Sequence, residues 1–105
     1  MKMIAALVAI LVLAGGSQAD DIVEIGRQIA EFNCSECHAV GTDDESRHPE
    51  APPFRHLSQR YPLDALEEAF AEGIYVGHPD MPTFEATPDQ LAALLAYLAT
   101  IQMTP

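Results

Sequence analysis

The chain has 105 residues, of which 16 are acidic and five are basic, and its formal net charge is −11 at neutral pH. A body with this charge is a poor partner for nucleic acid or for an anionic membrane surface, and its length allows one small domain. The charge favours partner proteins with a basic docking face, although an acidic surface that only maintains solubility is an equal alternative.

The first residues have the three parts of a secretory signal. Lys2 precedes an apolar stretch over residues 3–14, and small residues then lead to a cleavage site after Ala19. The stretch is shorter than the roughly 20 residues that span a bilayer, so an uncleaved anchor is the less favoured alternative. Cleavage of residues 1–19 leaves residues 20–105 as a single domain with four arginines, no lysine and 16 acids, which is a net charge of −12. We expect an exported, periplasmic protein with no stable membrane span, and a monomer is favoured.

The first predicted element is a helix over residues 21–33. Asp21 and Glu24 have the spacing of a capping box. Apolar residues recur at helical spacing: Ile22, Ile25, Ile29 and Phe32. Gly26 costs such a helix roughly 1 kcal/mol relative to alanine, so we expect another element to press close to the backbone there.

Cys34, Cys37 and His38 follow this helix in the pattern C-x-x-C-H. Two thiols at this spacing can form thioethers with the two vinyl groups of one porphyrin, and the next imidazole can bind its iron. The pattern therefore predicts one covalently attached haem c. A chance match, a structural disulfide, a redox dithiol and half of a zinc site are the alternatives, but a dithiol of the thioredoxin kind needs a βαβ context. Zinc needs a second ligand pair at short spacing, which the scattered remaining histidines do not give: His48, His56 and His78.

For the middle of the chain, the sequence pattern predicts one long loop followed by one helix. Residues 39–60 have no sustained hydrophobic period. The two prolines at positions 52 and 53 predict an extended segment over residues 51–54, from which Phe54 points inwards. Pro62 is expected to open a helix at its first position, and Gly73 is placed to end it. The apolar face of this helix consists of Leu63, Leu66 and Phe70.

For the last third of the chain, the pattern predicts an apolar loop followed by the helix with the strongest sequence signals. Residues 73–86 contain two glycines and two prolines but many apolar side chains, and we expect this loop to fold over a haem face with Tyr75 in the pocket. Thr87, Pro88 and Gln90 are typical of a helix start. The core stripe of that helix is Leu91, Leu94, Leu95, Leu98 and Ile101.

The second axial ligand of the iron is expected from the apolar loop. Met81 precedes Pro82, which stiffens its backbone, and is the favoured ligand. His78 is the main rival, Met103 is expected to fray at the chain end, and an open sixth position is a further possibility. A His/Met pair raises the reduction potential relative to two histidines.

In order and spacing, these landmarks resemble the class I cytochrome c family in its bacterial, single-haem form. The landmarks are Gly26, the pentapeptide at 34–38, Pro52-Pro53-Phe54, Met81-Pro82 and Tyr97 within the last helix. The resemblance implies a small all-α fold with long loops, in which the first and last helices cross at Gly26 around a covalently bound haem. It also implies that the Pro52 carbonyl, or less favourably that of Pro53, accepts a hydrogen bond from His38 and orients its ring. Phe54 is expected to pack in the same pocket.

Two departures limit what the resemblance implies. The family often has an aromatic residue where this chain has Ala30, and Phe32 is expected to compensate. The lysines with which mitochondrial-type members meet their oxidase are absent, so that kind of partner is not implied.

The function implied by the resemblance is electron transfer in the periplasm, with iron cycling between its ferric and ferrous states and with no enzymatic reaction. The protein could be free, or a dedicated subunit of a dehydrogenase or reductase. A gas-binding or enzymatic haem protein with an open or displaceable sixth ligand is the alternative.

Overall fold

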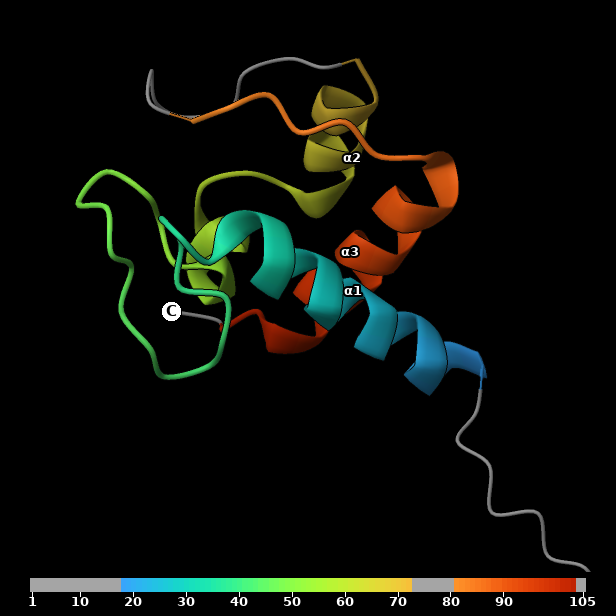
Figure 1. Cartoon of the computed structure of the whole chain (residues 1–105), viewed down its shortest axis with the longest axis horizontal. Helices are drawn as coiled ribbons and strands as arrows, with labels where there is room; N and C mark the ends of the chain where they lie inside the picture. The colour runs from blue at the N-terminus through green and yellow to red at the C-terminus, as the bar shows by residue number, and fades with distance from the viewer. Residues whose placement is uncertain (1–17, 73–80, 104–105) are drawn as a thin grey trace, which may run out of the picture.

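The computed structural model describes residues 18–72 and 81–103, and residues 1–17, 73–80 and 104–105 lie outside the described part (Figure 1). The described elements are α1 (Gln18–Cys34), the 3-10 helix η1 (Phe54–Gln59), α2 (Leu63–Glu72) and α3 (Pro88–Ile101). These ranges contain no strand, which confirms the predicted all-α class. None of the described helices is long and apolar enough to cross a membrane.

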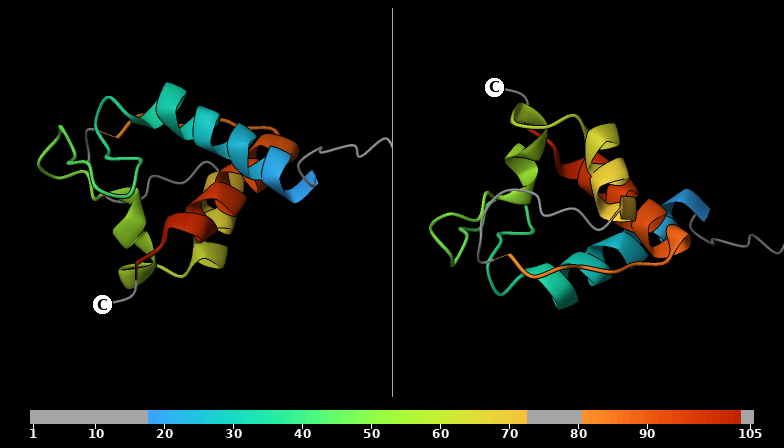
Figure 2. Two further views of the ribbon diagram at one scale, coloured as in Figure 1. Left: turned by 90° about the horizontal axis from the view of Figure 1, so that it is seen from below. Right: turned by 90° about the horizontal axis from the view of Figure 1, so that it is seen from above.

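Helices α1 and α3 pack across each other, and Gly26 lies at their crossing (Figure 2). A Cβ atom on Gly26 would lie 1.9 Å from the carbonyl oxygen of Ala93 and 2.8 Å from Cβ of Tyr97. Any side chain at this position would therefore collide with the backbone of α3. The predicted crossing is confirmed, and the close approach gives Gly26 its physical reason.

The face of α1 that packs on α3 differs from the expected one. Gly26 and Ala30 are buried in this interface, whereas Ile22 and Ile25 are 43% and 50% exposed and Phe32 is 89% exposed. Small residues let the two backbones approach, and Ile22, Ile25 and Phe32 are turned to solvent. Ile29 and Val23 still pack against the core. The expectation that Phe32 compensates for Ala30 is therefore wrong.

Helix α3 begins and ends with specific polar contacts. The Thr87 hydroxyl accepts a hydrogen bond from the Gln90 amide, and the Gln90 side chain accepts one from the Thr87 amide, which completes the predicted capping box. At the other end, Gln102 Nε2 donates to the Phe54 carbonyl at 2.7 Å, and the Met103 amide donates to the Arg55 carbonyl at 2.8 Å. Gln102 and Met103 are therefore joined to η1, and the expected fraying at Met103 is wrong for its backbone.

The middle of the chain contains one element that the sequence did not predict. The short helix η1 turns inwards with Phe54 and Leu57 buried. Helix α2 begins at Leu63, one residue later than expected, and the Pro62 carbonyl accepts from the amide of Leu66. Leu66 is buried, and Leu63 and Phe70 pack against the same core. Gly73, the expected end of α2, lies outside the described residues.

Candidate functional site

The C-x-x-C-H segment forms a tight turn at the C-terminal end of α1. The amides of Cys37 and His38 both donate to the carbonyl of Cys34, at 3.2 and 2.9 Å. The Ser35 hydroxyl donates to the carbonyl of Glu31, one turn back in the helix. The turn thus continues the helical hydrogen bonding just far enough to carry both thiols and the imidazole.

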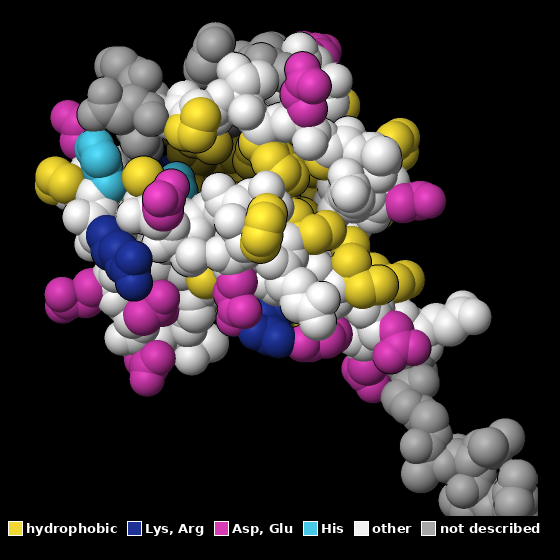
Figure 3. All heavy atoms as spheres, in the orientation of Figure 1, with side chains coloured by type: hydrophobic (Ala, Val, Ile, Leu, Met, Phe, Trp, Pro, Cys, Tyr) yellow, Lys and Arg dark blue, Asp and Glu magenta, His cyan; other side chains and the backbone are white. Residues whose placement is uncertain are grey.

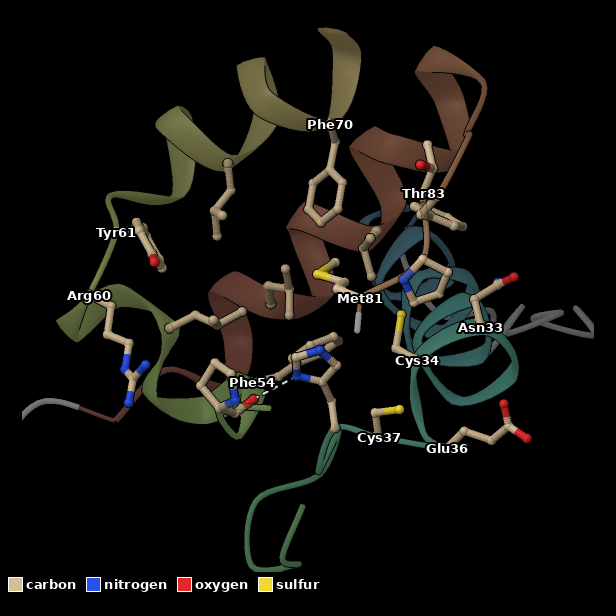
Figure 4. A pocket seen from close by; sticks show the side chains of 18 of the residues that line it. Asn33, Cys34, Glu36, Cys37, Phe54, Arg60, Tyr61, Phe70, Met81 and Thr83 are labelled. Atoms are coloured by element: carbon tan, nitrogen blue, oxygen red, sulfur yellow. Dashed lines mark hydrogen bonds between the residues drawn. The ribbon is translucent and has the colours of Figure 1, made fainter. Parts of the chain in front are cut away.

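The imidazole of His38 is held from the opposite side by the loop that precedes η1. His38 is 8% exposed, and its Nδ1 atom lies 2.8 Å from the Pro52 carbonyl oxygen, which is the dashed line in Figure 4. Because a carbonyl can only accept, Nδ1 carries the proton and donates. The ring of Phe54 lies 4.8 Å from that of His38, centroid to centroid. The amide of His48 donates to the Cys37 carbonyl at 3.1 Å and so fixes the start of the same loop.

The backbone that follows His38 is fixed by side chains that the sequence analysis missed. The Ala39 amide donates to the Ser46 hydroxyl at 2.9 Å, and the next two amides donate to the Asp44 carboxylate at 3.2 and 3.0 Å. Arg55 Nη1 donates to the Asp44 carbonyl at 2.6 Å. The Asp44 carboxylate acts locally, three and four positions from its donors, whereas the contact from Arg55 spans 11 positions and has no local pattern.

A cavity of about 340 Å³ opens between the C-x-x-C-H turn, η1, α2, α3 and the segment that leads into α3. Figure 3 shows it as a hollow with hydrophobic side chains in its depth. Of the expected site residues, six line it: Cys34, Cys37, His38, Pro52, Phe54 and Met81. Lining residues that the sequence analysis did not single out for the site include Leu57, Arg60, Tyr61, Leu94 and Leu98. Tyr75 and the rival ligand His78 lie outside the described residues.

The segment before α3 forms one wall of this cavity. Met81, Pro82, Thr83 and Phe84 all line it, and the side chain of Met81 points into the space in Figure 4. Phe84 packs edge to face on Phe70 of α2, with ring centroids 6.0 Å apart at 88°. This contact and the capping box of α3 hold the segment at its C-terminal end.

The donor atoms of the cavity suit an iron porphyrin better than a bare metal ion. The lining is mostly apolar, and it contains two thiols, a thioether and the buried imidazole atom Nε2, which carries a lone pair when Nδ1 is protonated. Burial raises the pKa of the Cys34 thiol to about 11, so this thiol stays neutral at pH 7. Within residues 18–72 and 81–103, no three His, Cys, Asp or Glu side chains are grouped so that they could hold a metal ion.

The comparisons with known proteins agree with this geometry. A sequence model of the family described as Cytochrome c matches residues 23–102. The chain is 33% identical over 76 residues to a protein named "Cytochrome c-553-like" from Synechocystis sp.. That match covers 72% of this chain and 66%, just under two thirds, of the relative. No solved structure matches the chain.

Proposed function

Because this chain belongs to the cytochrome c family and carries the covalent haem c that the family implies, we propose that it is a periplasmic electron carrier with His38 and Met81 as iron ligands. The haem, when bound, supplies an iron atom that accepts and releases one electron. The observation that carries the proposal is a single cavity lined by both cysteines, His38 and Met81. No substrate bond is made or broken.

Cys34 and Cys37 would anchor the haem as thioethers at the end of α1. Their thiols must be reduced when the thioethers form. The two cysteines are not joined to each other in the structure, and the turn between them is fixed by backbone hydrogen bonds. The attachment therefore fixes the haem to the longest described helix of the fold.

His38 would be the proximal ligand through Nε2. The Pro52 carbonyl accepts the Nδ1 proton at 2.8 Å, which fixes the tautomer, keeps the ring from turning and raises the basicity of Nε2. Phe54 packs on the same ring. A ligand held in this way needs little reorganisation when the iron changes its charge.

Met81 would be the distal ligand. A thioether favours the ferrous state relative to a second imidazole, so this pair raises the reduction potential. The apolar residues around it, among them Leu94 and Leu98, keep water from the iron and work in the same direction. The secretory signal predicted for residues 1–19 supports the periplasm as the compartment.

Optical spectra of the mature protein in both redox states test this assignment. In the ferric state we expect the weak charge-transfer band of a thioether–iron bond, and we expect Met81→Ala to abolish it. The matched control is Met103→Ala, which removes a 42% exposed methionine outside the cavity and should leave the band unchanged. Haem that stays on the chain after denaturation would support the two thioethers.

Four outcomes would contradict parts of the proposal. A high-spin spectrum in the ferric state, together with rapid binding of carbon monoxide in the ferrous state, would indicate an open sixth position and would rule out the carrier. A band that survives in Met81→Ala would show that another thioether, that of Met103, is the ligand. A low-spin wild-type protein without this band would instead favour a histidine ligand, which His78→Ala would then test. A product without covalent haem, made alongside the maturation machinery, would contradict the whole assignment.

A further inference from the structure

Two hydrogen bonds join the chain at His38 to the loop that precedes η1. His38 Nδ1 donates to the Pro52 carbonyl at 2.8 Å, the dashed line in Figure 4. Beside it, the Phe54 amide donates to the Ala39 carbonyl at 2.9 Å. The imidazole therefore keeps its acceptor only while the backbone after His38 stays in place against this loop.

The two peptide groups that follow His38 are held by two polar side chains. The Ala39 amide donates to the Ser46 hydroxyl at 2.9 Å, and the Val40 amide donates to the Asp44 carboxylate at 3.2 Å. Ala39 and Val40 are 1% and 7% exposed, so water gives their amides little replacement for these acceptors. The Ala39 carbonyl and the Val40 amide belong to one peptide group, which is thus bonded on both of its polar atoms.

Asp44 is in turn anchored to η1. Arg55 Nη1 donates to the Asp44 carbonyl at 2.6 Å and lies 3.7 Å from the carboxylate. The Arg55 side chain is 13% exposed, and the Arg55 carbonyl accepts from the Met103 amide at 2.8 Å, so the guanidinium extends from a fixed backbone. The contacts therefore form a closed circuit from His38 through Asp44 and Arg55 back to Pro52.

We propose that Ser46 and Asp44 are positioning residues, which hold His38 on the Pro52 carbonyl and thereby lower the reduction potential of the iron. This inference rests on the iron ligand in the proposed function. A complete hydrogen bond at Nδ1 makes the imidazole a stronger donor at Nε2, and a stronger donor favours the ferric state. The effect is opposite in sign to that of the Met81 thioether. If the peptide groups after His38 move freely, the Nδ1 bond is broken for part of the time and the ferrous state gains.

The first experiment compares the midpoint potentials of the haem-loaded wild type, Ser46→Ala, Ser46→Thr and Ser58→Ala. Ser46→Ala removes one acceptor without changing the net charge, and Ser46→Thr keeps a hydroxyl. Ser58 is an exposed serine on η1 whose hydroxyl makes none of the contacts above, so its variant is the matched control. At a fixed potential, we expect the ferric-to-ferrous ratio to fall by roughly two- to fivefold in Ser46→Ala. The other two variants should stay near the wild-type ratio.

The second experiment compares Asp44→Asn with Asp43→Asn. Both variants remove one negative charge from the same exposed stretch, but Asp44 is the residue that accepts from the amides of Val40 and Gly41. Loss of a negative charge alone favours the ferrous state in both variants. We expect Asp44→Asn to favour it by about twofold or more beyond Asp43→Asn. Equal shifts would assign the effect to charge and would contradict a positioning role for Asp44.

Hydrogen exchange separates positioning of the ligand from a general loss of stability. In the low-spin ferrous protein, NMR can follow the Nδ1 proton of His38 and the amide proton of Leu98, which is 1% exposed in α3. In Ser46→Ala we expect the Nδ1 proton to exchange roughly fivefold faster, while the exchange of the Leu98 amide changes little.

Two results would overturn this inference and leave the proposed function intact. One is a potential in Ser46→Ala equal to that of the wild type, and the other is an equal acceleration of both protons. A wild-type protein without covalent haem would overturn the proposed function and this inference with it.

Discussion

Tyr97 links the last helix to the backbone that follows His38. Its hydroxyl donates to the carbonyl of Val40, and its ring is 7% exposed. Burial, and secondly the Glu31 carboxylate, raise the pKa of this phenol. A single side chain therefore joins the helix crossing to the segment that carries the proximal histidine.

Removing this hydroxyl should lower stability and also change its dependence on pH. In Tyr97→Phe the Val40 carbonyl loses its donor, and we expect the free energy of unfolding at pH 7 to fall by about 1–2 kcal/mol. In the wild type, an unfolded-state phenol ionises near pH 10, whereas the native phenol resists ionisation. Ionisation of this group therefore does not change the stability below about pH 10, and the stability falls as the pH rises towards the native pKa.

Urea unfolding at a series of pH values checks both parts of this prediction. The alkaline loss of stability should be smaller in Tyr97→Phe than in the wild type, because the variant has no phenol at this position. An alkaline slope that is the same in both proteins would contradict the assignment of this loss to Tyr97.

Single residues of the site were predictable where a short pattern determines the chemistry. The C-x-x-C-H spacing pointed to Cys34, Cys37 and His38 because covalent chemistry fixes that spacing. Pro52 came only from the family resemblance. Arg60 and Asp44 were not identified, because their contacts depend on how the loop between α1 and α2 folds, and that loop has no period.

At the scale of elements, the approach of α1 to α3 depends on Gly26. The helix backbone of α3 fills the space in which a side chain would lie, and Ala30 continues the same small face one turn later. The crossing therefore excludes even the smallest additional group.

Gly26→Ala should destabilise the fold although alanine is the better helix former. The gain in helix propensity is about 1 kcal/mol, but the new Cβ would meet the Ala93 backbone at 1.9 Å. Because the two helices must separate, we expect a net loss of about 1–3 kcal/mol, measured by thermal or urea unfolding.

Gly41→Ala is the matched control for this prediction. Its Cβ would lie 2.9 Å from a carboxylate oxygen of Asp44, which is the end of a side chain that can move. The control should therefore cost less than the change at the crossing. If Gly26→Ala proved as stable as the wild type, the close approach of the helices would be wrong.

The helices α2 and α3 could be predicted from caps and prolines, and α1 from the helical spacing of its apolar residues, but not the orientation of α1 or the existence of η1. The capping box expected at Asp21 and Glu24 is wrong, because both residues lie inside α1. Thr87 and Pro88 mark the start of α3 through local hydrogen bonds and backbone restriction. In α1 the larger residues suggested the wrong buried face, because close backbone packing selects small residues over apolar area. The short turns of η1 have no amphipathic period to recognise.

At the scale of the molecule, the haem cavity is a large part of the interior. A space of about 340 Å³ would cost roughly 8 kcal/mol if nothing filled it, at about 24 cal/mol per Å³. That is comparable to the whole stability of a small domain, about 5–15 kcal/mol. The haem thus acts as core material as well as redox centre, since a chain of this length buries only a limited fraction of its surface without it.

The acidic surface predicts how electron transfer depends on salt. If the redox partner docks through a basic face, the bimolecular rate should fall about tenfold or more between low salt and 0.5 M, because salt screens the attraction. Stopped-flow measurements with the physiological partner check this. Hexacyanoferrate is a suitable control, since its negative charge predicts a rate that rises with salt. A rate with the partner that does not change with salt would remove the argument for a basic docking face.

The position of α3 at the end of the chain has a consequence for the order of events during synthesis. Val40 and Tyr97 are 57 positions apart, and at roughly 5–20 residues per second a ribosome needs about 3–11 s to make that stretch. During this interval α1 lacks its crossing partner, and the cavity lacks the wall formed by Leu94 and Leu98. The two cysteines are therefore presented on an open chain until α3 packs against α1.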